Sequence, residues 1–339
     1  ETVTRISVGL DMSVWHDRLS LGFNYYKSYV NNMLAYKTLG GVSGLRNYWS
    51  NEGKMENQGF DVAAVAKVMA LKDFSWEISA SVGHYKNEVT ALPDNDKTIY
   101  TSVYGGEVMT KVGNPIGLFY GYKTQGVFAT SEEAAKTDLR NGSENGSAFR
   151  AGDVHFSDLV ADGVIDNKDK DVIGNPNPDV FGNFGTSLHY KNWTLDAFFS
   201  YSLGNDIYNY QRAVLESGNS YYNQTTAMLN RWTSEGQLTS IPRVEYGDRM
   251  GNARFSDRWI EDGSYLKLKT LSLSYRFPFN LTFLQGITVW GAANNLFTCT
   301  KYLGSDPELS ISGNPIYQGI DRGLLGHGRS FVLGVKINL

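Results

Sequence analysis

An acidic segment at residues 158–169 has the residue types and spacing of a calcium-binding loop. Such a loop has twelve positions, with oxygen ligands at positions 1, 3, 5, 9 and 12, glycine at position 6 and a backbone carbonyl at position 7. Val160 supplies no ligand at position 3, so we expect a weak site that orders a long loop. An acidic, solvated turn is the alternative interpretation. The predicted ligands are Asp158, Asp162, the carbonyl oxygen of Val164, Asp166 and Asp169.

Aromatic residues are frequent in the same kind of long, polar segment. Exposed Tyr and Trp rings stack on sugar rings or pack against a protein partner. Packing among the loops themselves is the alternative for each ring taken alone, but as a group the rings favour a surface that binds a ligand or a partner. The residues in question are Tyr100, Tyr104, Tyr120, Tyr122, Tyr221, Tyr222 and Trp259.

No arrangement of residues in the sequence predicts catalysis. The five histidines lack the spacing of a zinc site, and the chain contains no G-x-S-x-G, P-loop or G-x-G-x-x-G motif. Its 31 basic and 35 acidic residues give a net charge of −4, which argues against a nucleic-acid partner. We therefore expect a protein that is not an enzyme and requires no cofactor, apart from the calcium predicted above.

Strands must hold the acidic and aromatic segments in place, and alternation of apolar and polar residues predicts where these strands are. From Trp193 to Leu203, large apolar residues occupy one face of the segment, and mostly Thr, Asp and Ser occupy the other. Such alternation predicts a strand with one apolar face, and a change of parity near Lys269 predicts a β-bulge. Most runs have the length of a strand that crosses a membrane at a tilt. Nine strands are predicted, at about 2–14, 18–30, 57–71, 74–87, 181–191, 193–203, 262–278, 285–298 and 327–339.

The connections between the predicted strands alternate strictly between short and long. Outer-membrane barrels have short periplasmic turns on one rim and long extracellular loops on the other. A soluble sandwich has no reason to place every long loop at one end, so the pattern favours a transmembrane antiparallel β-barrel. Nine strands do not close a barrel of even strand number, so we expect further strands from elsewhere. The long connections are 31–56, 88–180, 204–261 and 299–327.

Inside the long connections the sequence predicts only short elements. Residues 112–128 are expected to form an extracellular hairpin and not a tenth barrel strand, because the directions of the flanking strands leave no place for a single one. Residues 131–136 are expected to form a helix with Ser131 as its N-cap and an acidic first turn. Further helical structure is expected within 209–232, for example at 225–232.

A series of motifs resembles the SusC/RagA-like family of TonB-dependent outer-membrane transporters. Each motif is modest alone, but their order and spacing extend over the whole chain. Two positions depart from the family pattern: Cys299 replaces an aromatic residue, and Leu339 stands where barrels commonly end on one, which suggests a terminus further on. The matching segments are 51–59 (NEGKMENQG), 113–117 (GNPIG), 119–122 (FYGY), 152–153 (GD), 162–166 (DGVID), 173–178 (IGNPNP), 256–266 (SDRWIEDGSYL), 294–298 (NNLFT) and 300–308 (TKYLGSDPE).

The resemblance implies a 22-stranded barrel with an N-terminal plug domain. Residues 1–339 would form its C-terminal part, strands 14–22, with the plug and first strands absent from this chain. It also implies active import of glycans or peptides across the outer membrane of a Bacteroidota-like bacterium. The implied partners are a SusD-like surface lipoprotein, outer-membrane lipid and, through the missing N-terminal part, TonB.

Two other functions stay open on the sequence. One is a structural role, in which a SusC-like barrel is kept as a scaffold subunit of a larger outer-membrane complex without transport. The other is a soluble, carbohydrate-binding β-protein. A TonB box and plug upstream would favour import over the scaffold, and extraction only by detergent would exclude the soluble protein.

Overall fold

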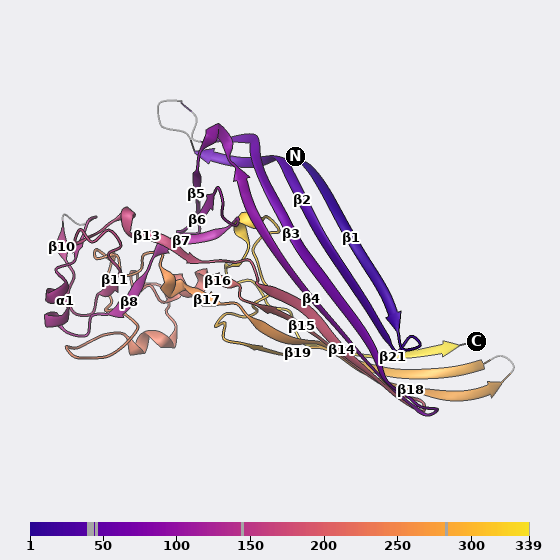
Figure 1. The fold of residues 1–339 in the computed structure, drawn as a ribbon. Helices are drawn as coiled ribbons and strands as arrows, with labels where there is room; N and C mark the ends of the chain where they lie inside the picture. The colour runs from indigo at the N-terminus through magenta and orange to yellow at the C-terminus, as the bar shows by residue number, and fades with distance from the viewer. Residues whose placement is uncertain (39–43, 45–46, 144–145, 282–283, 339) are drawn as a thin grey trace.

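The computed structural model of the chain describes residues 1–38, 44, 47–143, 146–281 and 284–338. Its dominant element is one antiparallel sheet (Figure 1). The nine predicted strands are all present in it, so the prediction of an all-β fold built on long antiparallel strands is confirmed. In their order across the sheet the strands are β1 (Thr2–Val14), β2 (Leu19–Thr38), β3 (Asn47–Ala70), β4 (Phe74–Ala91), β14 (Val180–Tyr190), β15 (Trp193–Leu203), β18 (Tyr265–Leu281), β19 (Leu284–Thr300) and β21 (Ser330–Asn338).

The register of the sheet is continuous except at a few bulges. One of them lies between Leu268 and Thr270 in the pairing of β18 with β19, which confirms the bulge predicted near Lys269. The pairing of β15 with β18 shifts at the same level, between Phe198 and Phe199. A bulge lets the strand keep its apolar face on one side of the sheet although the sequence changes parity.

Three of the predicted long connections fold together at one end of the sheet, and short turns lie at the other end (Figure 1). The bounds predicted for the connection 31–56 are wrong, because β2 extends to Thr38 and β3 begins at Asn47. We call residues 92–179, 204–264 and 301–329 the loop body. No described strand of this body joins the main sheet, as predicted for 112–128. Its strands are β5 (Thr98–Val103), β6 (Gly106–Lys111), β7 (Leu118–Tyr122), β8 (Thr124–Val127), β9 (Arg140–Asn141), β10 (Ser147–Ala148), β11 (Val154–Phe156), β12 (Val164–Ile165), β13 (Lys170–Gly174), β16 (Asp206–Asn209), β17 (Ile260–Asp262) and β20 (Ile320–Asp321).

Helices are few and short. The helix predicted at 131–136 is present as α1 (Ser131–Thr137), but its N-cap is Thr130 and not Ser131, because the Thr130 side chain accepts the Glu133 N–H at 3.1 Å. Among the described residues, no helix is both long and apolar enough to cross a membrane. The other helices are α2 (Tyr210–Leu215) and the 3-10 turns η2 (Pro93–Asn95), η3 (Asn167–Asp169), η4 (Thr226–Asn230), η5 (Asp257–Trp259) and η6 (Pro315–Tyr317).

The buried hydrophobic clusters lie in the loop body and at the adjoining end of β4. The first surrounds Phe128, Phe149 and Phe156. The second is built around Phe119 and Trp259, and the third is a small group that includes Val89 at the end of β4. The sheet itself presents many large apolar side chains on its surface instead. The fold therefore has a body with its own core and a sheet with an uncovered apolar face.

Candidate functional site

Two adjacent rows of residues show how the sheet separates its two faces. The apolar row and the polar row each cross eight strands, and they differ by a single position along each strand. Because neighbouring residues of a strand point to opposite faces, the two rows belong to opposite sides of the sheet. The apolar row is Met12, Leu21, Ala64, Ala80, Phe184, Phe199, Leu268 and Phe297. The polar row is Asp11, Gly22, Ala63, Ser81, Asn183, Ser200, Lys267 and Thr298.

Several large side chains of the apolar row remain exposed although they contact one another, whereas Leu268 is buried. Phe184 and Phe199 stack with ring centroids 4.6 Å apart, and Phe199 meets Phe297 edge to face at 6.4 Å. Even so, Met12 is 44% exposed and Phe297 is 46% exposed. An apolar face that spans the whole sheet is far larger than the scattered apolar groups of a soluble surface. This face therefore requires an apolar surrounding.

The polar face is hollowed where small residues follow one another across the strands. The hollow has a volume of about 540 Å³ and lies over Gly22. Asp11 and Asn24 line it from β1 and β2, and Asp61 and Asn183 line it from β3 and β14. Side chains of this kind suit contact with water or a polar solute. The two faces of the sheet thus fit two different solvents.

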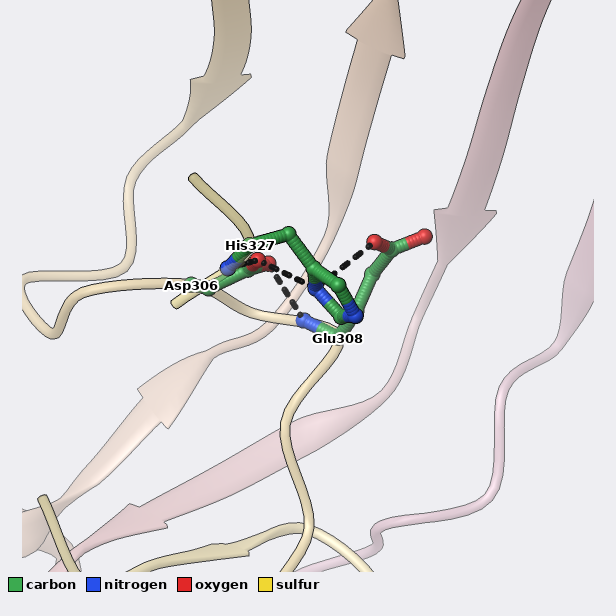
Figure 2. Close-up of side chains that lie close together, drawn as sticks. All are labelled: Asp306, Glu308 and His327. Carbon is green, nitrogen blue, oxygen red and sulfur yellow. Dashed lines mark hydrogen bonds and ion pairs between the residues drawn. The ribbon is translucent and has the colours of Figure 1, made fainter. Parts of the chain in front are cut away.

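A charged network ties the loop body to the polar face of the sheet. Lys267, in β18, is 1% exposed, and its Nζ donates to both carboxylate oxygens of Asp306 at 2.8 and 2.9 Å. The same Nζ lies 2.5 Å from Glu308 Oε2, which also accepts from Lys269 Nζ at 2.7 Å. The Nδ1 atom of His327 lies 2.9 Å from Asp306 Oδ2 (Figure 2). Five charged or titratable groups therefore hold residues 306–327 against the sheet.

The network is satisfied by its own cations. Among the described residues, Asp306, Glu308 and His327 are the one group of three metal-ligating side chains whose ligand atoms lie within 4.8 Å of one another. Both carboxylates, however, are already paired with lysine ammonium groups, which a metal ion would repel. Burial opposes the ionised form of Asp306, but hydrogen bonds from Lys267 and His327 outweigh it and lower its pKa to about 2. The arrangement is a structural clamp.

The acidic segment 158–169 forms a tight turn in which carboxylates accept backbone N–H groups. Asp158 accepts two such bonds, at 2.7 and 2.8 Å. Burial acts against ionised Asp158, but these bonds prevail and keep its pKa below its usual value. Asp169 is buried and accepts three, at 3.0, 3.3 and 2.8 Å.

The remaining predicted ligands lie in the same turn. Asp162 and Asp166 each accept one backbone N–H, at 3.0 and 2.7 Å, and Val164 lies in β12. Lys168 Nζ is 3.7 Å from Asp162 and 3.8 Å from Asp166. These bonds are those of the solvated acidic turn that is the alternative to calcium binding. Calcium binding at this segment stays a prediction.

The predicted loop aromatics separate into buried and exposed groups. Trp259 is 1% exposed inside the second core cluster, and Tyr122 packs edge to face on Phe156. The prediction of a ligand-facing ring is wrong for Trp259, because this ring is buried in loop packing. The Tyr122 ring also packs inside the loop body, but its role towards a ligand stays a prediction. Tyr104 packs partly buried against Tyr210. The role predicted for the others stays a prediction: they are Tyr100 and Tyr120, whose rings lie 4.8 Å apart, and Tyr221 and Tyr222, which are the most exposed.

The sequence reasoning did not find the clamp formed by Lys267, Asp306 and Glu308. One signal was present: Lys267 and Lys269 lie two positions apart in a strand, and 300–308 was among the matching motifs. Residues two apart in a strand lie on one face unless a bulge intervenes. Only the folded chain brings the acidic motif to that face.

Comparison with known proteins shows relatives along nearly the whole chain. No protein-family model matches. TonB-dependent receptor P3 of Formosa agariphila is 31% identical over 350 residues, which cover 99% of this chain and 34% of that receptor. TonB-dependent receptor SusC of Bacteroides thetaiotaomicron is 27% identical over 360 residues, which cover 99% of this chain and 32% of SusC. The chain therefore spans about a third of the length of these relatives.

A solved structure has the same fold. The RagAB peptide transporter matches with a TM-score of 0.79 at 23% sequence identity, over 99% of this chain and 35% of that one. The match includes the nine-stranded sheet and the connections at its end, since almost the whole chain is covered. These relatives are named as receptors and transporters. In sequence, the chain is therefore similar over almost its whole length to SusC-like TonB-dependent receptors, and it shares the fold of the RagAB transporter.

Proposed function

We propose that this chain forms part of the wall and the extracellular loops of an outer-membrane β-barrel that imports nutrients, and that it is not an enzyme. The observation that carries the proposal is the apolar row across eight strands, one residue away from the polar row. Lipid suits the first row and a water-filled lumen suits the second. In a bilayer the backbone groups are satisfied within the sheet, which favours a barrel.

The edges of the sheet support a larger barrel. Within the described chain, β1 and β21 each pair with one neighbour only. An open strand edge does not persist in the hydrocarbon of a membrane, because its N–H and C=O groups have no partner there. We therefore keep the proposal that these nine strands are the C-terminal strands 14–22 of a 22-stranded barrel whose other strands and plug are supplied elsewhere.

The loop body is proposed to lie outside the cell. The three connections that form the loop body reach the same end of the sheet, as extracellular loops do in outer-membrane barrels (Figure 1). Its buried core clusters suit a surface that must keep its shape. We propose a SusD-like surface lipoprotein as the partner of this surface, and coupling to TonB through a part of the receptor outside this chain.

The solute is proposed to be a glycan or a peptide. A peptide is the solute named for RagAB, which shares the fold. The second candidate function, a scaffold subunit without transport, has the same barrel wall and the same loop body. The two differ only in whether solute crosses the membrane.

Uptake by whole cells tests the proposal. Cells that lack the intact receptor should fail to accumulate a labelled oligosaccharide or peptide, and complementation with the wild-type receptor should restore accumulation. A proton uncoupler should abolish the restored uptake, because TonB-coupled import needs energy from the inner membrane. Unchanged uptake in the deletion strain, with loss of an outer-membrane complex, would favour the scaffold instead.

A further inference from the structure

A pocket in the loop body carries more positive than negative charge. It has a volume of about 360 Å³ and lies beside β6, β7 and the start of β13. Lys170 and Arg254 line it with one acidic residue, Glu107, and with the rings of Tyr120 and Tyr122. We call it the Arg254 pocket. Its lining holds two cations and a single carboxylate.

Arg254 is a largely buried cation without a counterion. Its Nη2 donates to the side-chain oxygen of Asn141, a neutral group. Nη1 is buried and has no hydrogen-bond partner, and the structure gives Nε no hydrogen bond and the guanidinium no ion pair among the described residues. Its ring contacts are with Tyr122 at 5.4 Å and Phe156 at 5.6 Å. Burial lowers the pKa of Arg254, with Tyr122 and Asp248 opposing the shift.

Buried arginines of this region are compensated in different ways. Arg258 also lacks an ion pair among the described residues, but its Nη1 donates to the carbonyl oxygen of Asn252 at 2.8 Å. Arg212 reaches Glu216 at 2.8 Å and Glu261 at 2.7 Å. Arg243 reaches the buried carboxylate of Asp153 at 2.8 Å. Buried charges in proteins are normally paired, because a buried charge without a partner is costly. The missing partner of Arg254 therefore points to an anion that the described chain does not supply.

Lys170 and Tyr122 line the pocket together with Arg254. Lys170 Nζ donates to Glu107 at 3.0 Å, which uses one of its three N–H groups. The same Nζ lies 5.8 Å from the centre of the Tyr122 ring. The Tyr122 hydroxyl makes no hydrogen bond to any described residue. An anion in the pocket would find an ammonium, a guanidinium and a phenolic O–H.

We propose that the Arg254 pocket binds a small oxyanion or the carboxylate of a larger solute, with Arg254 and Lys170 as its cationic ligands and the Tyr122 hydroxyl as a further donor. A water molecule would satisfy an N–H group but would leave the charge of Arg254 uncompensated, whereas an anion does both. The inference goes beyond nutrient import and holds whether or not the barrel transports anything.

Sulfate is the probe for a free oxyanion, and acetate is the probe for a carboxylate. Thermal unfolding of the intact purified receptor should shift upward as sodium sulfate replaces sodium chloride at constant ionic strength, since ligand that binds only the folded state stabilises it. Acetate at the same ionic strength should shift the midpoint if a carboxylate fits the pocket as well. A response to one probe alone identifies the class of anion.

Matched variants assign the response to the pocket. Arg254→Gln and Lys170→Gln should each raise the anion concentration for a half-maximal shift about tenfold, the loss expected for a charge-assisted hydrogen bond. Lys123→Gln is the control, because Lys123 forms a comparable ion pair with Asp171 at 2.5 Å but does not line the pocket. This control should respond to sulfate like the wild type.

A density map of the intact wild-type receptor soaked in selenate tests the pocket without any variant, so it does not depend on whether the variants fold. We expect anomalous selenium density between Arg254 and Lys170. Three results would overturn the proposal: no anion-specific shift in the wild type, an equal loss of response in the Lys123 control, or a carboxylate of the receptor itself seated on Arg254 in the map.

Discussion

The sheet and the loop body use the same kinds of residue in opposite ways. In the sheet, Phe184 and Phe297 stay exposed beside polar neighbours one position away. In the loop body, Phe128 and Phe156 are fully buried in clusters with no regular spacing. Alternation of apolar and polar residues suits a sheet one layer thick whose two faces meet different solvents. Irregular clusters of apolar residues suit a body that buries them in its own core. The difference teaches that a regular row of exposed apolar side chains fits a second solvent, whereas the exposed apolar groups of the loop body, such as Leu238 and Leu325, are scattered.

The clamp that joins the two regions should give the largest effect. Lys267→Met removes the buried cation and leaves Asp306 and Glu308 with too little positive charge, at an expected cost of about 3–5 kcal/mol. Thermal unfolding and proteolysis of residues 301–329 measure it. Lys269→Met is the control, because Lys269 is 30% exposed and shares only Glu308. Equal effects of the two substitutions would show that burial of Lys267 is unimportant.

A core substitution should destabilise the loop body and leave the sheet intact. Phe128 is fully buried and stacks on His155 at 4.3 Å. Phe128→Ala should cost about 3–5 kcal/mol, the loss usual for a large buried aromatic residue. Hydrogen exchange should rise in the loop body but not in β14 or β15. Tyr222→Ala, at a 75% exposed position, should change little; a comparable loss there would contradict the comparison.

A lysine in the sheet should be harmful on one face only. Phe184→Lys places a charge on the proposed lipid face and should cost up to about 2–4 kcal/mol near the bilayer midplane. Asn183→Lys changes the adjacent residue, which lies on the polar face, and should cost much less. Urea unfolding of the intact receptor in lipid vesicles measures both. Equal costs would mean that the two faces meet the same solvent.

Acid should weaken the clamp between about pH 4 and pH 2. The folded-state pKa of Asp306 is about 2, and that of Glu308 is also lowered: burial opposes the shift of Glu308, but hydrogen bonds from Lys267 and Lys269 outweigh it. A carboxylate with a lowered pKa contributes stability above its unfolded pKa, near 4, and loses it as the pH falls towards its folded pKa. We expect about 2 kcal/mol to disappear between about pH 4 and pH 2. Lys267→Met should flatten this dependence; a steeper one would contradict it.

The smallest effect is expected from calcium at 158–169. Millimolar calcium should raise the unfolding temperature of the loop body slightly, since a site with a missing ligand binds in the range of about 10⁻⁴–10⁻³ M. Asp162→Asn should abolish the shift, and Asp138→Asn, outside the segment, should not. A well-ordered map in calcium that lacks density near Asp158 and Asp166 would leave only the solvated turn.

Most of the sheet could be predicted from sequence because alternation is a local property. The bulge at Lys269 was visible for the same reason. Most of the loop body could not be predicted from the sequence, because its hydrophobic clusters join distant segments that show no regular spacing of apolar residues. Nothing in the neighbouring sequence marks Trp259 or Tyr122 as buried. The clamp depends on a contact between residues 267 and 306, which only the antiparallel pairing of β18 with β19 brings together. Ser131 and Thr130 are both good caps, so the sequence alone did not choose between them.

Spin labels on one strand test the central claim, that the apolar face of the sheet meets lipid and the polar face meets water. Single cysteines at 183 and 184 are labelled in the intact receptor in vesicles, in a Cys299→Ser background because Cys299 is exposed. The account predicts that oxygen, which concentrates in the bilayer, relaxes the label at 184 more strongly. It predicts that a water-soluble nickel complex relaxes the label at 183 more strongly. The reverse order, or the same accessibility at both positions, would contradict it.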